Sequence, residues 1–134
     1  MITAADTADP LAIVKLLRDA INTHDLAALV GCFATDFRSD LPTFPDASFI
    51  GNKNIRRNWE LLLAADPDMT AEIVRSTTDG DDAWVEWEQR GTRTNGQPHL
   101  VRGVVIFTVT HGHIASNRLY LHQVRSGPPD VLAP

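Results

Sequence analysis

Three turn signals divide the second half of the chain and constrain its fold more than any other feature. Asp79-Gly80-Asp81-Asp82 and His111-Gly112-His113 are short polar turns, and Asn95-Gly96 is the dipeptide favoured in two-residue β-hairpin turns. The segments between the turns predict four strands, over residues 69–78, 83–94, 99–110 and 114–124. Because consecutive strands joined by short turns pair antiparallel, we expect an antiparallel meander.

The first half of the chain carries helical signals instead. Asp9-Pro10 predicts a helix start, with aspartate as the N-cap and proline at the first helical position. Apolar residues then recur at helical spacing as far as Ile21, and Asp25 caps a second, shorter helix. A third helix is predicted over residues 52–65. Helices followed by a meander indicate an α+β domain with the helices packed on one face of the sheet.

Length and charge restrict the domain count and the function class. The chain has 134 residues, enough for one domain, which we expect to span residues 1–124 and to be followed by a mobile tail over 125–134. Its net charge is −5 and its basic residues are dispersed, which argues against nucleic-acid binding. No apolar run is long enough to span a bilayer, so no membrane segment is expected.

The cysteine content and the N-terminus bear on location. Cys32 is the only cysteine, so an intramolecular disulfide is impossible and a reducing compartment is favoured. The first ten residues contain no apolar run and do not resemble a signal peptide. We therefore expect a cytoplasmic protein.

One predicted strand is apolar at every position from Val104 to Phe107. A sheet with one wet face would alternate here, so both faces of this strand are expected to be covered. The helices would cover one face. A second copy of the chain would cover the other, which predicts a homodimer through the outer face of the sheet.

A short strand after the second helix carries the first candidate site. In Phe37-Arg38-Ser39-Asp40-Leu41, strand alternation places Arg38 and Asp40 on one face and Phe37 and Leu41 on the other. A cation and a carboxylate side by side form either a solvated ion pair or part of a binding site. The local pattern leaves both interpretations open.

Several motifs in the same order resemble the nuclear transport factor 2-like superfamily, and within it the SnoaL-like group. They are Phe33-Ala34-Thr35-Asp36-Phe37 closing the second helix, Gly51 opening the third, Trp87 followed by Arg90-Gly91-Thr92, and Gly112-His113-Ile114 leading into Arg118-Leu119-Tyr120-Leu121-His122. The resemblance spans residues 11–124 and implies a cystatin-like cone, in which a curved antiparallel sheet wraps the three N-terminal helices around a deep pocket. Enzymes of this superfamily include ketosteroid isomerase, limonene epoxide hydrolase and polyketide cyclases, which use acid–base chemistry and usually no metal or organic cofactor.

The resemblance implies a catalytic role for Asp40. Its stretch, Asp40 to Pro45, is similar to the part of limonene epoxide hydrolase that holds a water-positioning polar residue. The base of ketosteroid isomerase would fall instead on Leu41, which weakens an isomerase assignment. A carboxylate in an apolar pocket could act as a base, with Arg38 orienting substrate or stabilising charge. The alternative is a solvated Asp40–Arg38 pair.

The last strand departs from the family pattern. Relatives often carry Tyr-x-Asp or Tyr-x-Glu where this chain has Tyr120-Leu121-His122. The resemblance places Tyr120 and His122 in the pocket, with histidine taking over the proton transfer. Simple binary patterning instead points Leu119 and Leu121 inward and leaves His122 at an edge or interface.

Four aromatic residues are candidate pocket walls, because ligand sites are mostly apolar. They are Trp59, Trp87, Phe44 and Phe49. Ordinary core packing is the alternative for each. His111 and His113 could ligate zinc, but no third ligand stands at a recognisable spacing, so no metal site and no cofactor are expected.

Two functions remain open from the sequence. The first is a cofactor-independent enzyme, of isomerase, cyclase or hydrolase type, acting on a hydrophobic small molecule through Asp40, His122, Tyr120 and Arg38. The second is a non-catalytic dimeric domain that binds a ligand or scaffolds a partner. The missing carboxylate at His122 motivates the second.

Overall fold

The computed structural model describes residues 9–127 and contains three α-helices against one sheet. The helices are α2 (Pro10–Asn22), α3 (Leu26–Gly31) and α4 (Asn52–Ala65). The side chain of Asp9 accepts a hydrogen bond from the Leu11 backbone N–H and that of Asp25 from Ala28, so both predicted N-caps are confirmed. Most of the tail expected to be mobile lies outside the described residues.

Six strands form the sheet, in the order β2-β1-β6-β5-β4-β3. Their bounds are β1 (Phe33–Asp40), β2 (Phe49–Ile50), β3 (Thr70–Asp79), β4 (Asp82–Thr92), β5 (Pro98–Thr110) and β6 (His113–Gln123). The four-stranded meander is confirmed. The expectation of a wholly antiparallel sheet is wrong in one place, because β1 pairs parallel to β6, for example Ser39 with Asn117.

The parallel pair follows from the connection between its strands. A tight turn can only reverse the chain, whereas α4 and four strands separate β1 from β6 in the sequence. The segment between β1 and α4 also differs from the expected loop, because it contains a short 3₁₀ turn (Pro45–Ala47) and the edge strand β2.

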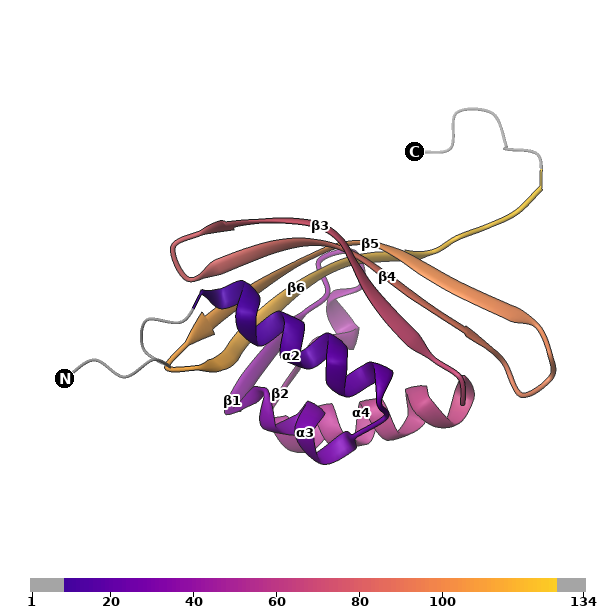
Figure 1. Cartoon of the computed structure of the whole chain (residues 1–134), viewed down its shortest axis with the longest axis horizontal. Coiled ribbons are helices and arrows are strands. Elements are labelled where there is room, and N and C mark those ends of the chain that lie inside the picture. Colours follow the sequence, from indigo (N-terminus) through magenta and orange to yellow (C-terminus); the bar gives the residue numbers. More distant parts are fainter. Residues whose placement is uncertain (1–8, 128–134) are drawn as a thin grey trace.

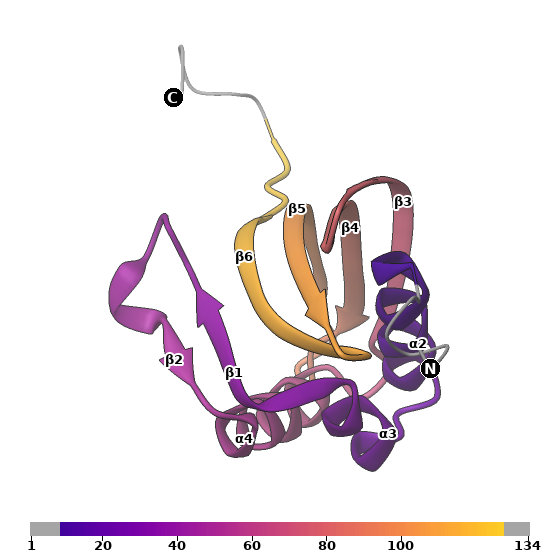
Figure 2. The ribbon, with the colours of Figure 1, turned by 90° about the vertical axis from the view of Figure 1, so that its left-hand side faces the viewer.

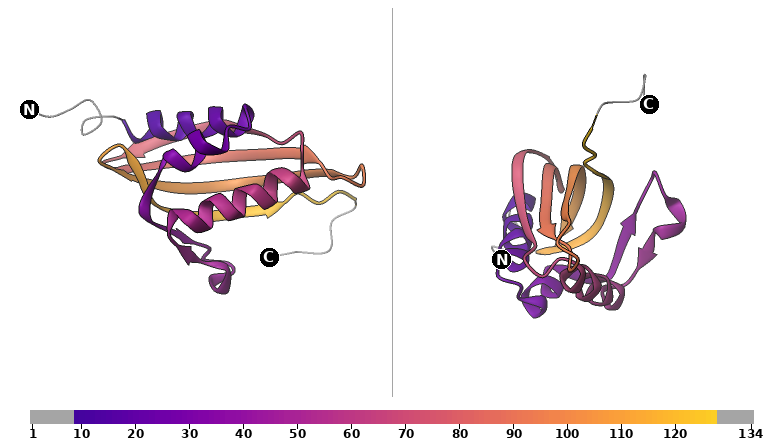
Figure 3. Two further views of the ribbon diagram at one scale, coloured as in Figure 1. Left: turned by 90° about the horizontal axis from the view of Figure 1, so that it is seen from below. Right: turned by 90° about the vertical axis from the view of Figure 1, so that its right-hand side faces the viewer.

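The sheet curls around the helices. Figure 2 shows this curvature when the strands are followed in order from β2 to β3. Helices α2 and α4 lie along the same face (Figures 1 and 3). The α+β cone expected from the sequence is therefore confirmed. Core residues on the inner face include Phe37, Val85, Val105 and Ile114, each no more than 1% exposed.

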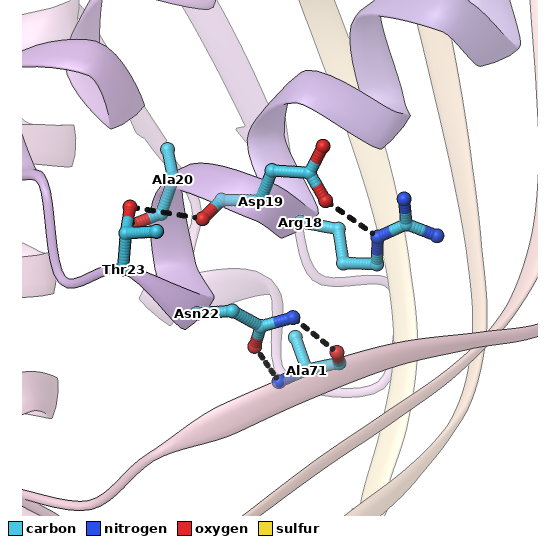
Figure 4. Close-up of polar contacts among 6 residues, drawn as sticks. All are labelled: Arg18, Asp19, Ala20, Asn22, Thr23 and Ala71. Atoms are coloured by element: carbon cyan, nitrogen blue, oxygen red, sulfur yellow. Dashed lines mark hydrogen bonds and ion pairs between the residues drawn. The ribbon is translucent and has the colours of Figure 1, made fainter.

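The free edge of the sheet at β3 is tied to helix α2. Asn22, at the end of the helix, donates from Nδ2 to the Ala71 carbonyl oxygen over 3.1 Å and accepts from the Ala71 N–H at Oδ1 over 2.7 Å (Figure 4). A side-chain amide thus substitutes for a neighbouring strand at this position, because it offers one donor and one acceptor.

The outer face of the sheet carries apolar side chains at its centre. Trp84 is 46% exposed and Val104 is 36% exposed, whereas their inner-face neighbours Val85 and Val105 are buried. The apolar run in β5 therefore has one face in the core and one face open in the single chain. None of the helices in the described residues is long and apolar enough to cross a membrane.

Candidate functional site

A cavity of about 230 Å³ lies between α4 and the inner face of the sheet. Most of its wall is apolar. The residues that line it are Leu17, Phe33, Ser39, Leu41, Ala47, Phe49, Ile55, Asn58, Trp59, Leu62, Trp87, Gln89, Val105, Phe107, Asn117, Leu119 and Leu121. None of these lining residues has a titratable side chain, and this decides what the cavity can do chemically.

The polar groups of the cavity are neutral and partly paired with each other. Ser39 Oγ donates to Asn117 Oδ1 over 2.9 Å, which joins β1 to β6, and both residues are buried. Trp87 Nε1 donates to Gln89 Oε1 over 3.0 Å within β4. Hydrogen bonding compensates for the desolvation of these groups, which would otherwise cost about 1–3 kcal/mol each.

Leu41 lines the cavity at the position where the resemblance to ketosteroid isomerase would place the catalytic base. An apolar side chain there can neither accept nor donate a proton. Strand alternation accounts for its direction, since Phe37 and Ser39 also face inward.

Arg38 and Asp40 lie together on the opposite face of β1, as their spacing predicted. Their side chains form an ion pair, with Arg38 Nε 3.1 Å from Asp40 Oδ1, and are 63% and 27% exposed. Of the two interpretations left open by the sequence, this geometry matches the solvated ion pair, and neither residue lines the cavity.

Tyr120 and His122 also face outward, so the expectation that they point into the pocket is wrong. Leu119 and Leu121 occupy the inward positions of β6 and line the cavity. Arg118 donates from Nη2 to the Tyr120 hydroxyl over 3.2 Å. That bond raises the pKa of the Arg118 guanidinium, and the neighbouring Asp40 carboxylate adds to the effect. Binary patterning succeeded here because an apolar side chain is more stable inside than a tyrosine or histidine without partners.

Three of the four candidate aromatic residues line the cavity. Trp59 comes from α4, Trp87 from β4 and Phe49 from β2. Phe44 does not line it and is 63% exposed, so its predicted place in the wall is wrong. Phe44 precedes the 3₁₀ turn, where the chain leaves the sheet.

The polar cavity residues Ser39, Asn58, Gln89 and Asn117 were missed by reasoning from the sequence. Ser39 carried a usable signal, because it shares its strand face with Phe37 and Leu41. Asn117 and Gln89 carried no such signal. The partner of Asn117 is set by the register between β1 and β6, and the partner of Gln89 is Trp87, its neighbour on the same face of β4.

A second buried polar group lies one helical turn beyond the cavity. Asp66, which is 1% exposed, accepts at Oδ2 from His99 Nδ1 over 2.7 Å, and its Oδ1 lies 3.4 Å from Arg93 Nε. His99 Nε2 lies 3.1 Å from Arg93 Nη2. Because a guanidinium can only donate, Nε2 must accept, so the imidazole proton is on Nδ1 and faces Asp66. Gly91 permits this approach, because a Cβ there would lie 2.7 Å from Asp66 Cβ.

No metal centre is evident among the residues that the structure describes, since no three His, Cys, Asp or Glu side chains gather there. His113 Nδ1 contacts the His111 carbonyl oxygen at 3.1 Å within their turn. Cys32 is buried, and burial raises the pKa of its thiol.

The fold, with a largely apolar cavity between the helices and the sheet, is that of the small α+β cone proteins. The sequence model of the SnoaL-like domain matches residues 14–117, and the chain belongs to that family. No curated protein gives a significant match to the sequence.

Solved structures agree with this assignment. A proposed polyketide cyclase from Sinorhizobium meliloti is 29% identical, with 85% of this chain and 99% of that chain covered and a TM-score of 0.66. IdmH from Streptomyces antibioticus, also a proposed polyketide cyclase, is 23% identical over 86% and 91% of the two chains, with a TM-score of 0.72. A Mycobacterium tuberculosis protein in complex with estradiol-17beta-hemisuccinate is 17% identical over 83% and 92%, with a TM-score of 0.73. At these identities the last two comparisons establish the fold alone.

Proposed function

We propose that this protein binds an uncharged, largely apolar small molecule in the cavity between α4 and the sheet. The observation that carries the proposal is the lining itself, which combines apolar walls with neutral hydrogen-bonding groups and has no titratable side chain. A charged ligand would lose its hydration there without gaining a counter-ion, at a cost of several kcal/mol. The similar mycobacterial protein binds a steroid conjugate, and the rigid apolar ring system of that ligand supports a ligand with a rigid apolar body, although its hemisuccinate end is a carboxylate.

Tryptophan fluorescence tests the proposal directly, because Trp59 and Trp87 both line the cavity. Titration with the hydrocarbon anthracene should quench their emission saturably. The variant Leu119→Trp, which fills the cavity, should abolish that saturable change. Trp84→Phe is the matched control, because Trp84 lies on the outer face and its replacement should leave binding unchanged. Absence of saturable quenching in the unmodified protein would exclude the proposal.

Acid–base catalysis remains a second candidate, and the position of Asp40 favours it. Asp40 lies on the outer face of β1 beside Arg38, and its register partner on β6 is Arg118. In this alternative Asp40 acts on the outer face of the sheet, with Arg38, Tyr120 and His122 on the same side. Asp40→Asn and His122→Ala would then lose turnover of an identified substrate while keeping the fold. Full turnover in both variants would remove this candidate.

A homodimer through the outer face of the sheet is part of the proposal. Trp84 and Val104 are exposed at its centre, and the Arg75–Glu86 and Arg102–Glu88 ion pairs, at 3.6 and 3.4 Å, flank them. An apolar centre with a polar rim is the usual anatomy of an interface. Light scattering should give twice the chain mass of 14.7 kDa, and Val104→Glu should reduce the measured mass to that of one chain. A mass of one chain for the unmodified protein would contradict the dimer. Cytoplasmic location stays a prediction, which cell fractionation would test.

A further inference from the structure

We propose that the Asp66–His99–Arg93 group is a pH-sensitive latch, which holds the β4–β5 turn to the end of helix α4 and opens when His99 takes up a proton. Asp66 directly follows α4, Arg93 begins the turn and His99 lies on β5. Figure 3 shows the turn just beyond the end of α4. None of the three residues lines the cavity, so this inference is independent of the proposed binding function.

The two ring nitrogens of His99 have opposite roles in the closed latch. Nδ1–H donates to Asp66 Oδ2 over 2.7 Å, and Nε2 accepts from Arg93 Nη2 over 3.1 Å. A guanidinium offers only donors, so the second contact exists only while Nε2 carries no proton. Protonation of Nε2 turns this acceptor into a donor and removes the bond from Arg93.

Burial decides which cation remains beside Asp66 after that protonation. The side chains of Asp66 and His99 are 2% and 14% exposed, whereas that of Arg93 is 40% exposed. While His99 is neutral, Arg93 is the counter-ion of the buried carboxylate. Once His99 is protonated, the imidazolium neutralises Asp66, and the charge of Arg93 is left without a partner. Arg93 is the member of the group that can return to water.

The contact of Arg93 with Asp66 does not hold the latch closed by itself. Arg93 Nε lies 3.4 Å from Asp66 Oδ1, but that buried oxygen accepts no hydrogen bond. Within the group, the guanidinium donates its hydrogen bond to His99 Nε2. Protonation therefore removes the one directional bond that ties the turn to the rest of the group.

The neighbouring charged groups confine the change to the turn. Asp68 accepts from the Thr92 N–H over 2.6 Å, and this bond lowers the pKa of Asp68 from 3.8. Its carboxylate therefore stays ionised, and keeps Thr92 in place, over the range of about pH 5 to 8 in which histidines titrate. His24 acts on the charge of Asp68, and its Nε2 contacts the Met69 carbonyl oxygen at 2.8 Å.

Two backbone hydrogen bonds report on the state of the turn. The Arg93 N–H donates to the Gln97 carbonyl oxygen and the Gly96 N–H to that of Arg93, both over 2.8 Å. Release of the Arg93 side chain frees this turn from α4, so both amides should exchange their hydrogens more readily.

Hydrogen exchange followed by NMR on the full chain tests the latch at about pH 7.5 and about pH 5.5, with each rate divided by the intrinsic rate at that pH. Protection of the amides of residues 93 and 96 should fall by about 10-fold on acidification, the factor that corresponds to one lost hydrogen bond. Nitrogen shifts of the imidazole should show His99 protonated on Nδ1 alone at the higher pH and on both nitrogens at the lower.

Three variants assign the effect. His99→Gln takes up no proton, so protection should not depend on pH. Arg93→Ala lacks the latch and should show low protection at both pH values. His24→Gln removes the histidine that acts on Asp68, keeps a donor for Met69 and should retain the pH dependence of the unmodified protein.

Equal protection of the unmodified protein at both pH values would overturn the inference. A pH dependence that persists in Arg93→Ala, or one that disappears in His24→Gln, would also overturn it. If His99→Gln does not fold, the change at the half-exposed Arg93 still decides the outcome.

Discussion

Asn22 and Ala71 form a two-bond clasp between the end of helix α2 and the edge strand β3, with distances of 2.7 and 3.1 Å (Figure 4). Edge strands expose unpaired backbone groups, which favours pairing with other chains. At Ala71 the helix satisfies these groups internally. The clasp also fixes where the helix lies along the sheet.

Replacement of Asn22 tests the strength of this clasp. Asn22→Ala removes two hydrogen bonds and leaves a partly buried backbone N–H and C=O without partners, so we expect a loss of about 1–3 kcal/mol in the free energy of unfolding. Urea denaturation measures this value. Asn22→Asp keeps the acceptor and should recover part of the loss. Identical stability of the alanine variant and the unmodified protein would contradict the role of the clasp.

Leu41 offers a test of the neutral cavity. Leu41→Asp should introduce a carboxyl whose pKa is raised by burial, so anthracene binding should weaken as the pH rises and the group ionises. Between pH 5 and 8 the unmodified cavity should show no such change, because its lining has no titratable group. Ile50→Asp, at a position that is 63% exposed, provides the control, since its carboxylate should stay in water. A pH-independent affinity in Leu41→Asp would show that position 41 does not face the ligand.

The Asp66–His99–Arg93 group predicts a large stability effect. Gly91→Ala places a methyl group against Asp66 Cβ at 2.7 Å, and the clash must displace the carboxylate from His99 and Arg93. Leaving the buried Asp66 carboxylate without its hydrogen-bond partner costs about 1–3 kcal/mol. Thermal unfolding should show a Tm lower by several degrees. Gly31→Ala, where nothing lies within 4 Å of the added carbon, should not lower it.

The hydrogen bond to Asp68 predicts that the free energy of unfolding falls at low pH. The Thr92 backbone N–H donates to its carboxylate over 2.6 Å and lowers the pKa of Asp68 from its usual value of 3.8. Because the folded-state pKa is the lower one, Asp68 stabilises the fold above the unfolded pKa, and this contribution disappears as the pH falls through the folded value. The stability difference between the unmodified protein and Asp68→Asn should therefore be present at pH 6 and shrink as the pH falls below 3.8. Chemical denaturation across this range measures it, and a difference that grows in acid would contradict the assignment.

Local sequence patterns predicted the parts of this protein that depend on neighbours in the chain. The caps at Asp9 and Asp25 start the helices as expected. The turn at Asn95-Gly96 joins β4 and β5, but it is longer than the expected two-residue turn, because the Gly96 N–H donates to the Arg93 carbonyl oxygen and the Arg93 N–H to that of Gln97. Alternation on β1 placed Arg38 and Asp40 on one face because side chains two apart in a strand point the same way. The same rule correctly points Leu119 and Leu121 of β6 inward. The resemblance to the family led instead to the wrong expectation that Tyr120 and His122 face the pocket.

The tertiary structure alone decided which polar groups meet. Ser39 and Asn117 are 78 residues apart and touch only because β1 runs parallel to β6, and no local pattern encodes that register. Asp66 reaches His99 across 33 residues because Gly91 leaves room for it. Backbone geometry and side-chain polarity set turns, caps and strand faces within a few residues, so the sequence determines them. The composition of the cavity depends on how distant strands are brought into register by the packing of the whole core, so only the folded structure determines it.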